Sequence, residues 1–282
     1  MSIDTTVFER LDWRADRVLL DDLVLRLPRR AGADWELGEE CLDFYKLPKL
    51  VDQYAAFFAR HPGIRADNLL ELGIFGGGSM AFWFECLQPR KHVGIDIKDR
   101  ADSDYFRRFL VRRGAESRVK TYWATSQDDV AALARIVERE FDGPLDVVID
   151  DASHFYEPTR VSFEALFPRL RPGGLYVIED WAWAHWRDVP LSPKFVARAS
   201  ELTHFVTELV AAAGTDLQLI PHIEICQGFT VVERGPAAIA PGSFRLADHI
   251  YVRGGGAWQA ARRRLARLIR QRTRPPTGST AH

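Results

Sequence analysis

The chain has 282 residues, of which 46% are hydrophobic and 27% charged, a balance typical of a globular protein with one sizeable core. A formal net charge of −1 argues against a basic protein drawn to nucleic acid or membrane surfaces. The three cysteines lack C-x-x-C spacing, so they indicate neither a disulfide framework nor a zinc site. We find no signal-peptide pattern and no apolar run near the roughly 20 residues that span a bilayer, and we expect a cytoplasmic protein.

The N-terminal part is only partly legible. Residues 17–26 fit either a strand pair or a short helix, and residues 28–33 indicate a loop. Residues 46–60 predict a helix with Pro48 in its first turn, which we expect to lie beside the mouth of a ligand site. Four apolar side chains fall on one face of this helix: Leu50, Tyr54, Phe57 and Phe58.

A glycine-rich turn follows, and it is the strongest motif in the sequence. Residues 69–74 form an apolar run of strand length, Gly76–Gly78 break it, and residues 79–87 predict a helix. Strand, glycine turn and helix make the first unit of a nucleotide-binding sheet. The glycines allow a sharp turn and close approach of a ligand, toward which the helix directs free N–H groups.

The spacing of the glycines distinguishes between ligands. Glu71, Gly73 and Gly77 fit E-x-G-x-x-x-G, the pattern of class I S-adenosylmethionine (SAM) methyltransferases, better than the G-x-G-x-x-G of a Rossmann dehydrogenase. An acidic side chain here suits the positive groups of SAM. The alternative is an ordinary turn between strand and helix. Five residues are candidate cofactor contacts: Glu71, Gly73, Gly76, Gly77 and Ser79.

The second strand, residues 91–97, carries Asp96 near its end. An acid at this point of a nucleotide-binding sheet accepts hydrogen bonds from ribose hydroxyls. The alternative is that Asp96 only starts the next loop. We favour the ribose role because Asp96 closes an otherwise apolar strand.

The third strand, residues 119–124, follows a predicted helix at residues 104–114. We expect Ser126 to cap the helix after it. Gln127 or Asp128 could contact the adenine amine from the same loop, although capping explains these residues almost as well.

The alternation of strands and helices then continues to a terminal hairpin. We predict strands at 145–150 and 175–180, helices at 159–170 and 200–213, a turn at 171–174, and hairpin strands at 217–226 and 229–234. This pattern predicts an α/β fold with a doubly wound, mostly parallel seven-stranded sheet and a terminal antiparallel hairpin.

Two pairs of acids follow the fourth and fifth strands, Asp150–Asp151 and Glu179–Asp180. If these strands are neighbours, about 4.8 Å apart, the carboxylates converge. Converged carboxylates repel each other, and a hard divalent cation such as Mg²⁺ resolves the repulsion. The alternative is that one acid of each pair caps a helix or pairs with Arg160 or Arg171.

His154 lies three residues after Asp151, on the loop beside these acids. The ordinary pKa of histidine suits a general base near neutral pH. The alternative for a lone loop histidine is a hydrogen bond to the backbone. The position beside the acid pairs favours the base.

Three segments together resemble a known family: residues 71–79, 148–154 and 171–180 are similar to the metal-dependent sugar O-methyltransferases of macrolide and related glycosylated natural-product pathways. Residues 46–54 resemble a lead-in helix of the cephalosporin hydroxylase-like branch. The resemblance spans roughly residues 46–234. It implies SAM as methyl donor. Ser126, Gln127 and Asp150 are further candidate cofactor contacts. The resemblance further implies Mg²⁺ held by Asp151, Glu179 and Asp180, with His154 as base.

The resemblance implies a methyltransferase domain at residues 46–235, between an N-terminal extension at 1–45 and a C-terminal extension at 236–282. The C-terminal extension carries a basic amphipathic stretch at 262–270, which we interpret as a solvated helix followed by a disordered tail.

We expect the partner to be a small-molecule hydroxyl acceptor that carries sugars. We expect no nucleic-acid partner and no membrane partner. Trp181, Trp183 and Trp186 could wall a sugar or planar aglycone, or could simply cover the edge of the sheet. A catechol-type methyltransferase and a non-catalytic SAM-binding protein remain alternatives. A homo-oligomer is compatible with the sequence, which does not fix the oligomeric state.

Overall fold

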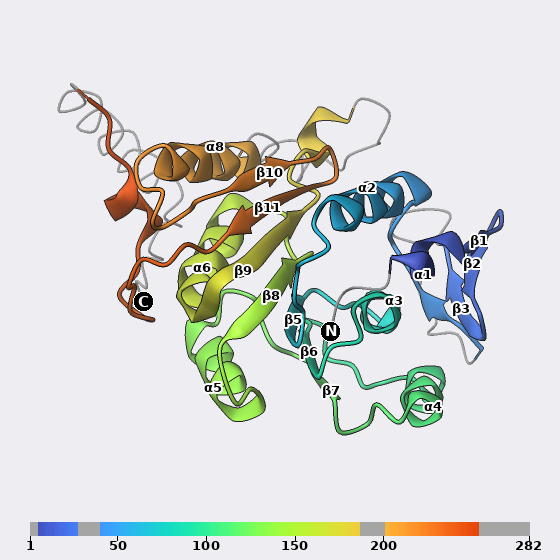
Figure 1. The fold of residues 1–282 in the computed structure, drawn as a ribbon. Helices are drawn as coiled ribbons and strands as arrows, with labels where there is room; N and C mark the ends of the chain where they lie inside the picture. Colours follow the sequence, from blue (N-terminus) through green and yellow to red (C-terminus); the bar gives the residue numbers. More distant parts are fainter. Residues whose placement is uncertain (1–4, 28–39, 187–200, 254–282) are drawn as a thin grey trace, which may run out of the picture.

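The computed structural model of the chain describes residues 5–27, 40–186 and 201–253 (Figure 1). Its centre is a seven-stranded sheet in the order β10-β11-β9-β8-β5-β6-β7. Strands β5 to β9 pair in parallel, and β11 pairs antiparallel with β9 and β10. The predicted doubly wound sheet is therefore confirmed. The strands are β5 (Asn68–Leu72), β6 (Lys91–Ile95), β7 (Val119–Tyr122), β8 (Leu145–Asp150), β9 (Leu170–Glu179), β10 (Ile223–Ile225) and β11 (Phe229–Glu233).

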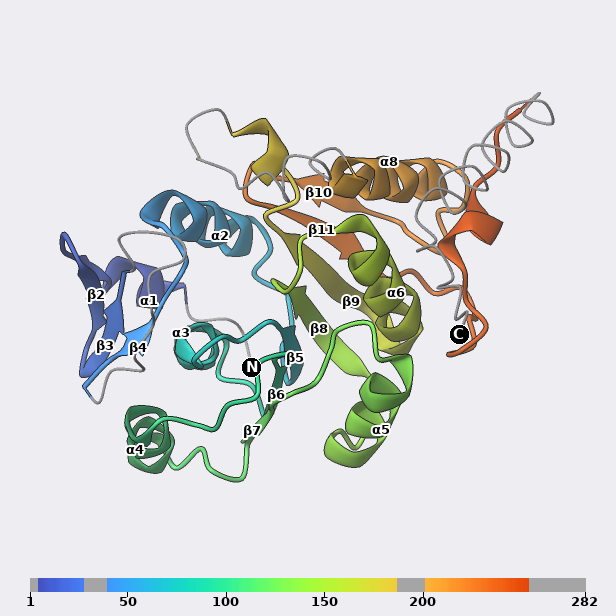
Figure 2. The same cartoon turned by 180° about the vertical axis from the view of Figure 1, so that it is seen from behind.

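Helices cover both faces of the sheet (Figures 1 and 2). Neighbouring residues of β5 point to opposite faces, Leu69 toward one hydrophobic core and Leu70 toward the other. Both faces are thus buried, as the near-continuous apolar strands require. The first face packs on α2 (Pro48–Arg60), α3 (Gly78–Leu87) and α4 (Asp104–Arg113), and the second on α5 (Val130–Glu140), α6 (Tyr156–Leu166) and α8 (Glu201–Ala213).

The N-terminal segment forms a second, four-stranded sheet after the short helix α1 (Thr6–Glu9). Of the two readings left open for residues 17–26, the strand pair is the observed one, with Leu20 opposite Leu23 in an antiparallel turn. This sheet buries its apolar side chains in the same core as α2 and α3. Its strands are β1 (Asp12–Trp13), β2 (Arg17–Leu20), β3 (Leu23–Arg26) and β4 (Leu42–Asp43).

Three predicted boundaries were wrong. The hairpin strand predicted at 217–226 is only β10 (Ile223–Ile225), because residues 217–219 form a turn. Strand β9 begins at Leu170, because residues 171–174 form an irregular part of the strand rather than a turn. Gly173 has a φ of 76° there, so the Pro-Gly-Gly signal belongs to a bulge within the strand. Helix α6 begins at Tyr156 and ends at Leu166, where the 3₁₀ turn η1 (Phe167–Arg169) leads into β9.

The helix cap predicted at Ser126 was also wrong. Asp129 caps α5, and its side chain accepts a hydrogen bond from the Ala132 N–H at 2.9 Å. The predicted loop at 28–33 and the basic stretch at 262–270 lie outside the described residues. Across the ranges that the structure describes, every helix is too short or too polar to cross a bilayer.

Candidate active site

The glycine turn after β5 is shaped by contacts within the protein. Gly73 has a φ of 85°, and a Cβ there would lie 2.3 Å from the Asp151 carbonyl oxygen. A Cβ on Gly78 would lie 1.9 Å from the carbonyl oxygen of Asp43. We had attributed these glycines to the approach of a ligand. The structure adds a different reason, since the backbones of β4 and of the loop after β8 pack directly on the turn.

Glu71, on β5, is fully buried under this turn. Its Oε2 lies 3.2 Å from His92 Nε2, and among the described residues its Oε1 has no hydrogen-bond partner. A buried carboxylate oxygen left unpaired is costly, and a cationic ligand group would satisfy it. The residues therefore fit the positively charged end of SAM. His92, which the sequence analysis did not single out, fixes the other oxygen.

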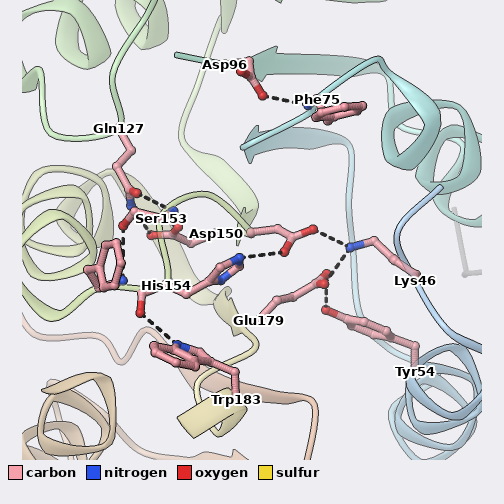
Figure 3. A network of polar contacts seen from close by, with 12 residues as sticks. Lys46, Tyr54, Phe75, Asp96, Gln127, Asp150, Ser153, His154, Glu179 and Trp183 are labelled. Carbon is pink, nitrogen blue, oxygen red and sulfur yellow. Dashed lines mark hydrogen bonds and ion pairs between the residues drawn. The ribbon is translucent and has the colours of Figure 1, made fainter. Parts of the chain in front are cut away.

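Asp96 lies just after β6, at the edge of the sheet beside the glycine turn (Figure 3). Its Oδ2 accepts from the Phe75 N–H at 2.7 Å, and its Oδ1 accepts from the Lys98 N–H at 2.8 Å. A carboxylate has about four acceptor positions, so both oxygens can take a further bond. The position and free acceptor capacity fit the predicted ribose contact.

Gln127 and Asp150 form a buried bridge instead of an open contact surface. The Gln127 Nε2 donates to Asp150 Oδ1 at 3.1 Å, and its Oε1 accepts from the Ser153 N–H at 2.8 Å (Figure 3). Ser162 and Tyr176 also donate to Asp150. Burial raises the pKa of Asp150 to about 6, although these hydrogen bonds counteract the rise. This network holds the loop that carries His154.

The acids of the fourth and fifth strands do converge, because β8 and β9 are neighbours. Ligand atoms of Asp151, His154 and Asp180 all lie within 4.8 Å of one another. His154 Nε2 is 3.9 Å from Asp151 Oδ1, and both side chains are partly exposed. One oxygen from each strand tip and one ring nitrogen therefore lie close enough together to bind a single ion.

Glu179 lies beside this group but already has partners. The Lys46 Nζ is 2.6 Å from Glu179 Oε2 and 2.9 Å from Asp151 Oδ2 (Figure 3). The hydroxyl of Tyr54, on α2, donates to Glu179 Oε1 at 2.8 Å. The sequence analysis considered Arg160 and Arg171 as partners of the acids and missed Lys46.

The charges of this cluster do not balance. Three carboxylates, those of Asp151, Glu179 and Asp180, face the single ammonium of Lys46. Burial and the neighbouring carboxylates raise the pKa of Glu179 and of Asp180 above their ordinary values. Burial alone would lower the pKa of Lys46, but the acids outweigh it and keep the side chain charged. The residues fit a divalent cation, which would stabilise the ionised form of these crowded carboxylates.

Of the six described non-glycine residues with a left-handed backbone conformation, four follow parallel strands of the seven-stranded sheet. Phe75, Ala124 and Asp180 have φ of 51°, and His154 has φ of 56°. These residues follow β5, β7, β9 and β8 respectively. Such conformations cost energy and cluster at functional sites. Their common position marks this edge of the sheet as the site.

Tryptophans of residues 181–186 form hydrogen bonds with neighbouring loops. Trp183 is buried, and its Nε1 donates to the His154 carbonyl oxygen at 3.2 Å (Figure 3). Trp181 Nε1 donates to the Cys226 carbonyl oxygen at 2.8 Å. Trp183 therefore helps to hold the loop that carries His154. Trp186 is only partly buried.

The fold and the site define a class. A parallel sheet with a glycine turn after β5, an acid after β6 and an antiparallel β11 is the Rossmann-like methyltransferase fold. Residues 70–181 match the family described as "Methyltransferase domain". This part of the chain is therefore a methyltransferase domain.

Two curated relatives show which kind of methyltransferase the chain is similar to. The chain is 39% identical over 126 residues to demethylmacrocin O-methyltransferase of Streptomyces fradiae, a match that covers 42% of this chain and 28% of the relative. It is 36% identical over 167 residues to the 8-demethyl-8-alpha-L-rhamnosyl tetracenomycin-C 2'-O-methyltransferase of Streptomyces olivaceus, which covers 57% of this chain and 39% of that relative. The matched part thus spans well under half of these relatives.

A solved structure of a similar protein also comes from a natural-product pathway. The MycE methyltransferase from the mycinamycin biosynthetic pathway, in complex with Mg and SAH, has 29% sequence identity and a TM-score of 0.50. The match covers 68% of this chain and 50% of that one.

Proposed function

We propose that the protein is a SAM-dependent and Mg²⁺-dependent O-methyltransferase that methylates a sugar hydroxyl of a glycosylated natural product. The observation that carries the proposal is the convergence of Asp151, His154 and Asp180 beside the glycine turn of a methyltransferase sheet. The names of the relatives support the acceptor class.

Residues on the glycine side would hold SAM. Glu71 offers its unpaired Oε1 to the cofactor's ammonium, and Asp96 offers its oxygens to the ribose hydroxyls. The backbone around Gly73, Gly76 and Gly77, with Ser79 in the first turn of α3, faces the same ligand. Ser126, Gln127 and Asp150 would act on the adenine side by shaping the loops around it.

Residues on the acid side would hold Mg²⁺. Asp151 and Asp180 provide carboxylate oxygens directly, and Glu179 would complete the set if it exchanged its bond to Lys46 for the cation. When bound, SAM would supply its sulfonium methyl group and Mg²⁺ would lower the pKa of an acceptor hydroxyl.

His154 would take the proton of the acceptor hydroxyl. Its ring is partly exposed, so an acceptor can reach Nε2, which lies 3.9 Å from Asp151 Oδ1 and so remains beside the acids. The loop is fixed from below by Trp183 and from the side by Ser153 and Gln127. A base held in place needs no reorganisation before the proton moves.

The test is methyl transfer from SAM to a panel of acceptors, followed by mass spectrometry, with and without EDTA. The panel contains macrolide glycosides with free sugar hydroxyls and simple catechols. We expect methylated sugars only, and no product in EDTA. Methylation of catechols alone would replace the acceptor class, and SAM binding without any product would favour a non-catalytic SAM-binding protein.

A further inference from the structure

A second group of metal-ligand side chains lies away from the acid cluster, at the outer edge of the sheet. Ligand atoms of His61, His222 and Glu224 all lie within 4.8 Å of one another. His61 follows the last residue of α2, while His222 and Glu224 belong to the edge strand β10 and its lead-in. Figures 1 and 2 show α2 beside this strand.

The distances suit a metal centre. His61 Nε2 is 2.8 Å and His222 Nε2 is 4.0 Å from the same oxygen, Glu224 Oε2. Ligand atoms of a tetrahedral zinc site, with bonds of about 2.0–2.1 Å, lie about 3.3 Å apart. The two observed distances bracket that value, so small side-chain rotations would bring the three atoms to it.

The surroundings leave one carboxylate oxygen free for this purpose. Arg60 bonds to Glu224 Oε1, which leaves Oε2 facing the two histidines. The His61 ring also lies against Phe57, with centroids 4.7 Å apart, which limits its rotation.

We propose that His61, His222 and Glu224 form a zinc site that ties the end of α2 to the edge strand β10. Two imidazoles and one carboxylate are ligands that Zn²⁺ accepts readily, whereas Mg²⁺ prefers oxygen ligands alone. His222 is half exposed, so water can take the fourth position.

The site has a consequence for the acid cluster. Helix α2 carries Tyr54, whose hydroxyl donates to Glu179, and Gln53, whose Oε1 accepts from the Gly228 N–H at 3.0 Å. A metal ion bound to His61 would fix the C-terminal end of the same helix, since Gln53 and Tyr54 lie in its middle. Zinc at this site therefore stabilises the helix that supports Glu179 through Tyr54, without contacting the acids themselves.

The test is isothermal titration of ZnCl₂ into the metal-free full chain carrying Asp180→Asn, which weakens the acid cluster as a competing site. We expect one zinc ion per chain. Adding His222→Ala should weaken binding at least about 100-fold, because loss of a ligand exceeds the 10–100-fold typical of an outer partner. His222 is half exposed, so this variant should fold.

Cys226→Ser is the matched control. Its Sγ lies 3.8 Å from Glu224 Oε1, the oxygen on the Arg60 side, so zinc affinity should not change. Cobalt(II) in place of zinc should give the intense visible absorption of a four-coordinate ion, and His222→Ala should abolish it. Absence of zinc binding, or equal affinity in the His61→Ala and His222→Ala variants and their parent, would overturn the proposal and leave only a His61–Glu224 ion pair.

Discussion

At the carboxyl ends of the parallel strands, the proposed cofactor side, around Glu71 and Asp96, and the acid side, around Asp151 and Glu179, are built differently. On the cofactor side, Asp96 holds the backbone of Phe75, 21 residues away, and of Lys98, two residues away. On the acid side, Lys46 reaches Asp151 across 105 residues and Glu179 across 133. The hydrogen bonds of Asp96 thus join nearby chain segments, whereas the ion pairs of the acid side require the segment before α2 to dock on the finished sheet.

This difference predicts that the two sides can be disrupted separately. Changes in the lead-in to α2 should disturb the acids and the proton transfer while leaving cofactor affinity intact. Changes around Asp96 should do the reverse. The variants below test this separation.

The largest effect is expected from His154→Ala. Loss of a general base should lower kcat about 10²–10⁴-fold, and steady-state kinetics would measure it. The residual activity should rise with pH, because external hydroxide partly replaces the base, and the affinity for S-adenosylhomocysteine should not change. His185→Ala is the control, since His185 is exposed and bonds to Thr203. Equal losses in both variants would move the base assignment away from His154.

Lys46→Met should cause the largest loss of stability. It removes the ammonium from a fully buried ion pair and leaves the Glu179 carboxylate without its main partner. We expect a loss of about 3–5 kcal/mol in the free energy of unfolding, measured by urea denaturation. Excess Mg²⁺ should return part of it. Lys49→Met, at an exposed position near the start of α2, should be close to neutral; a matching loss there would show that the effect is not due to the cluster.

Tyr54→Phe removes one hydroxyl and leaves Glu179 Oε1 without its donor. A buried acceptor left unsatisfied should cost about 1–3 kcal/mol of unfolding free energy. Tyr251→Phe is the control because Tyr251 is largely exposed. A stability of Tyr54→Phe equal to that of the parent would mean that α2 does not support the acid side.

Asp96→Ala is the converse variant. It should weaken binding of S-adenosylhomocysteine by about 1–3 kcal/mol, through the lost charged hydrogen bonds, and leave Mg²⁺ affinity unchanged. Calorimetry measures both. Asp99→Ala, at an exposed position of the same loop, should retain full affinity. If Asp96→Ala also abolished Mg²⁺ binding, the two sides could not be independent.

The difference in sequence separation explains which site residues could be predicted from the sequence. Asp151 and Asp180 could be placed together, because each ends a strand and the order of strands in such sheets is regular. Lys46 could not, because no local pattern links it to acids more than a hundred residues away. A lysine among apolar residues at the very start of a predicted helix was the available signal.

Local ambiguity explains the smaller errors. Ser126, Asp128 and Asp129 are all good helix caps, and only the backbone geometry selects Asp129. The Pro-Gly-Gly of residues 172–174 signals a turn in any sequence, yet here pairing with β8 and β11 continues the strand on both sides of it.

In the proposed function, the acids at the ends of β8 and β9 hold a divalent cation independently of the cofactor. The most direct measurement is titration of Mg²⁺ into metal-free protein saturated with S-adenosylhomocysteine, by calorimetry. We expect one Mg²⁺ site in the parent and in His61→Ala, and its loss in Asp180→Ala with no change in S-adenosylhomocysteine affinity. Equal Mg²⁺ binding in Asp180→Ala and the parent, or no Mg²⁺ binding in the parent, would contradict the account.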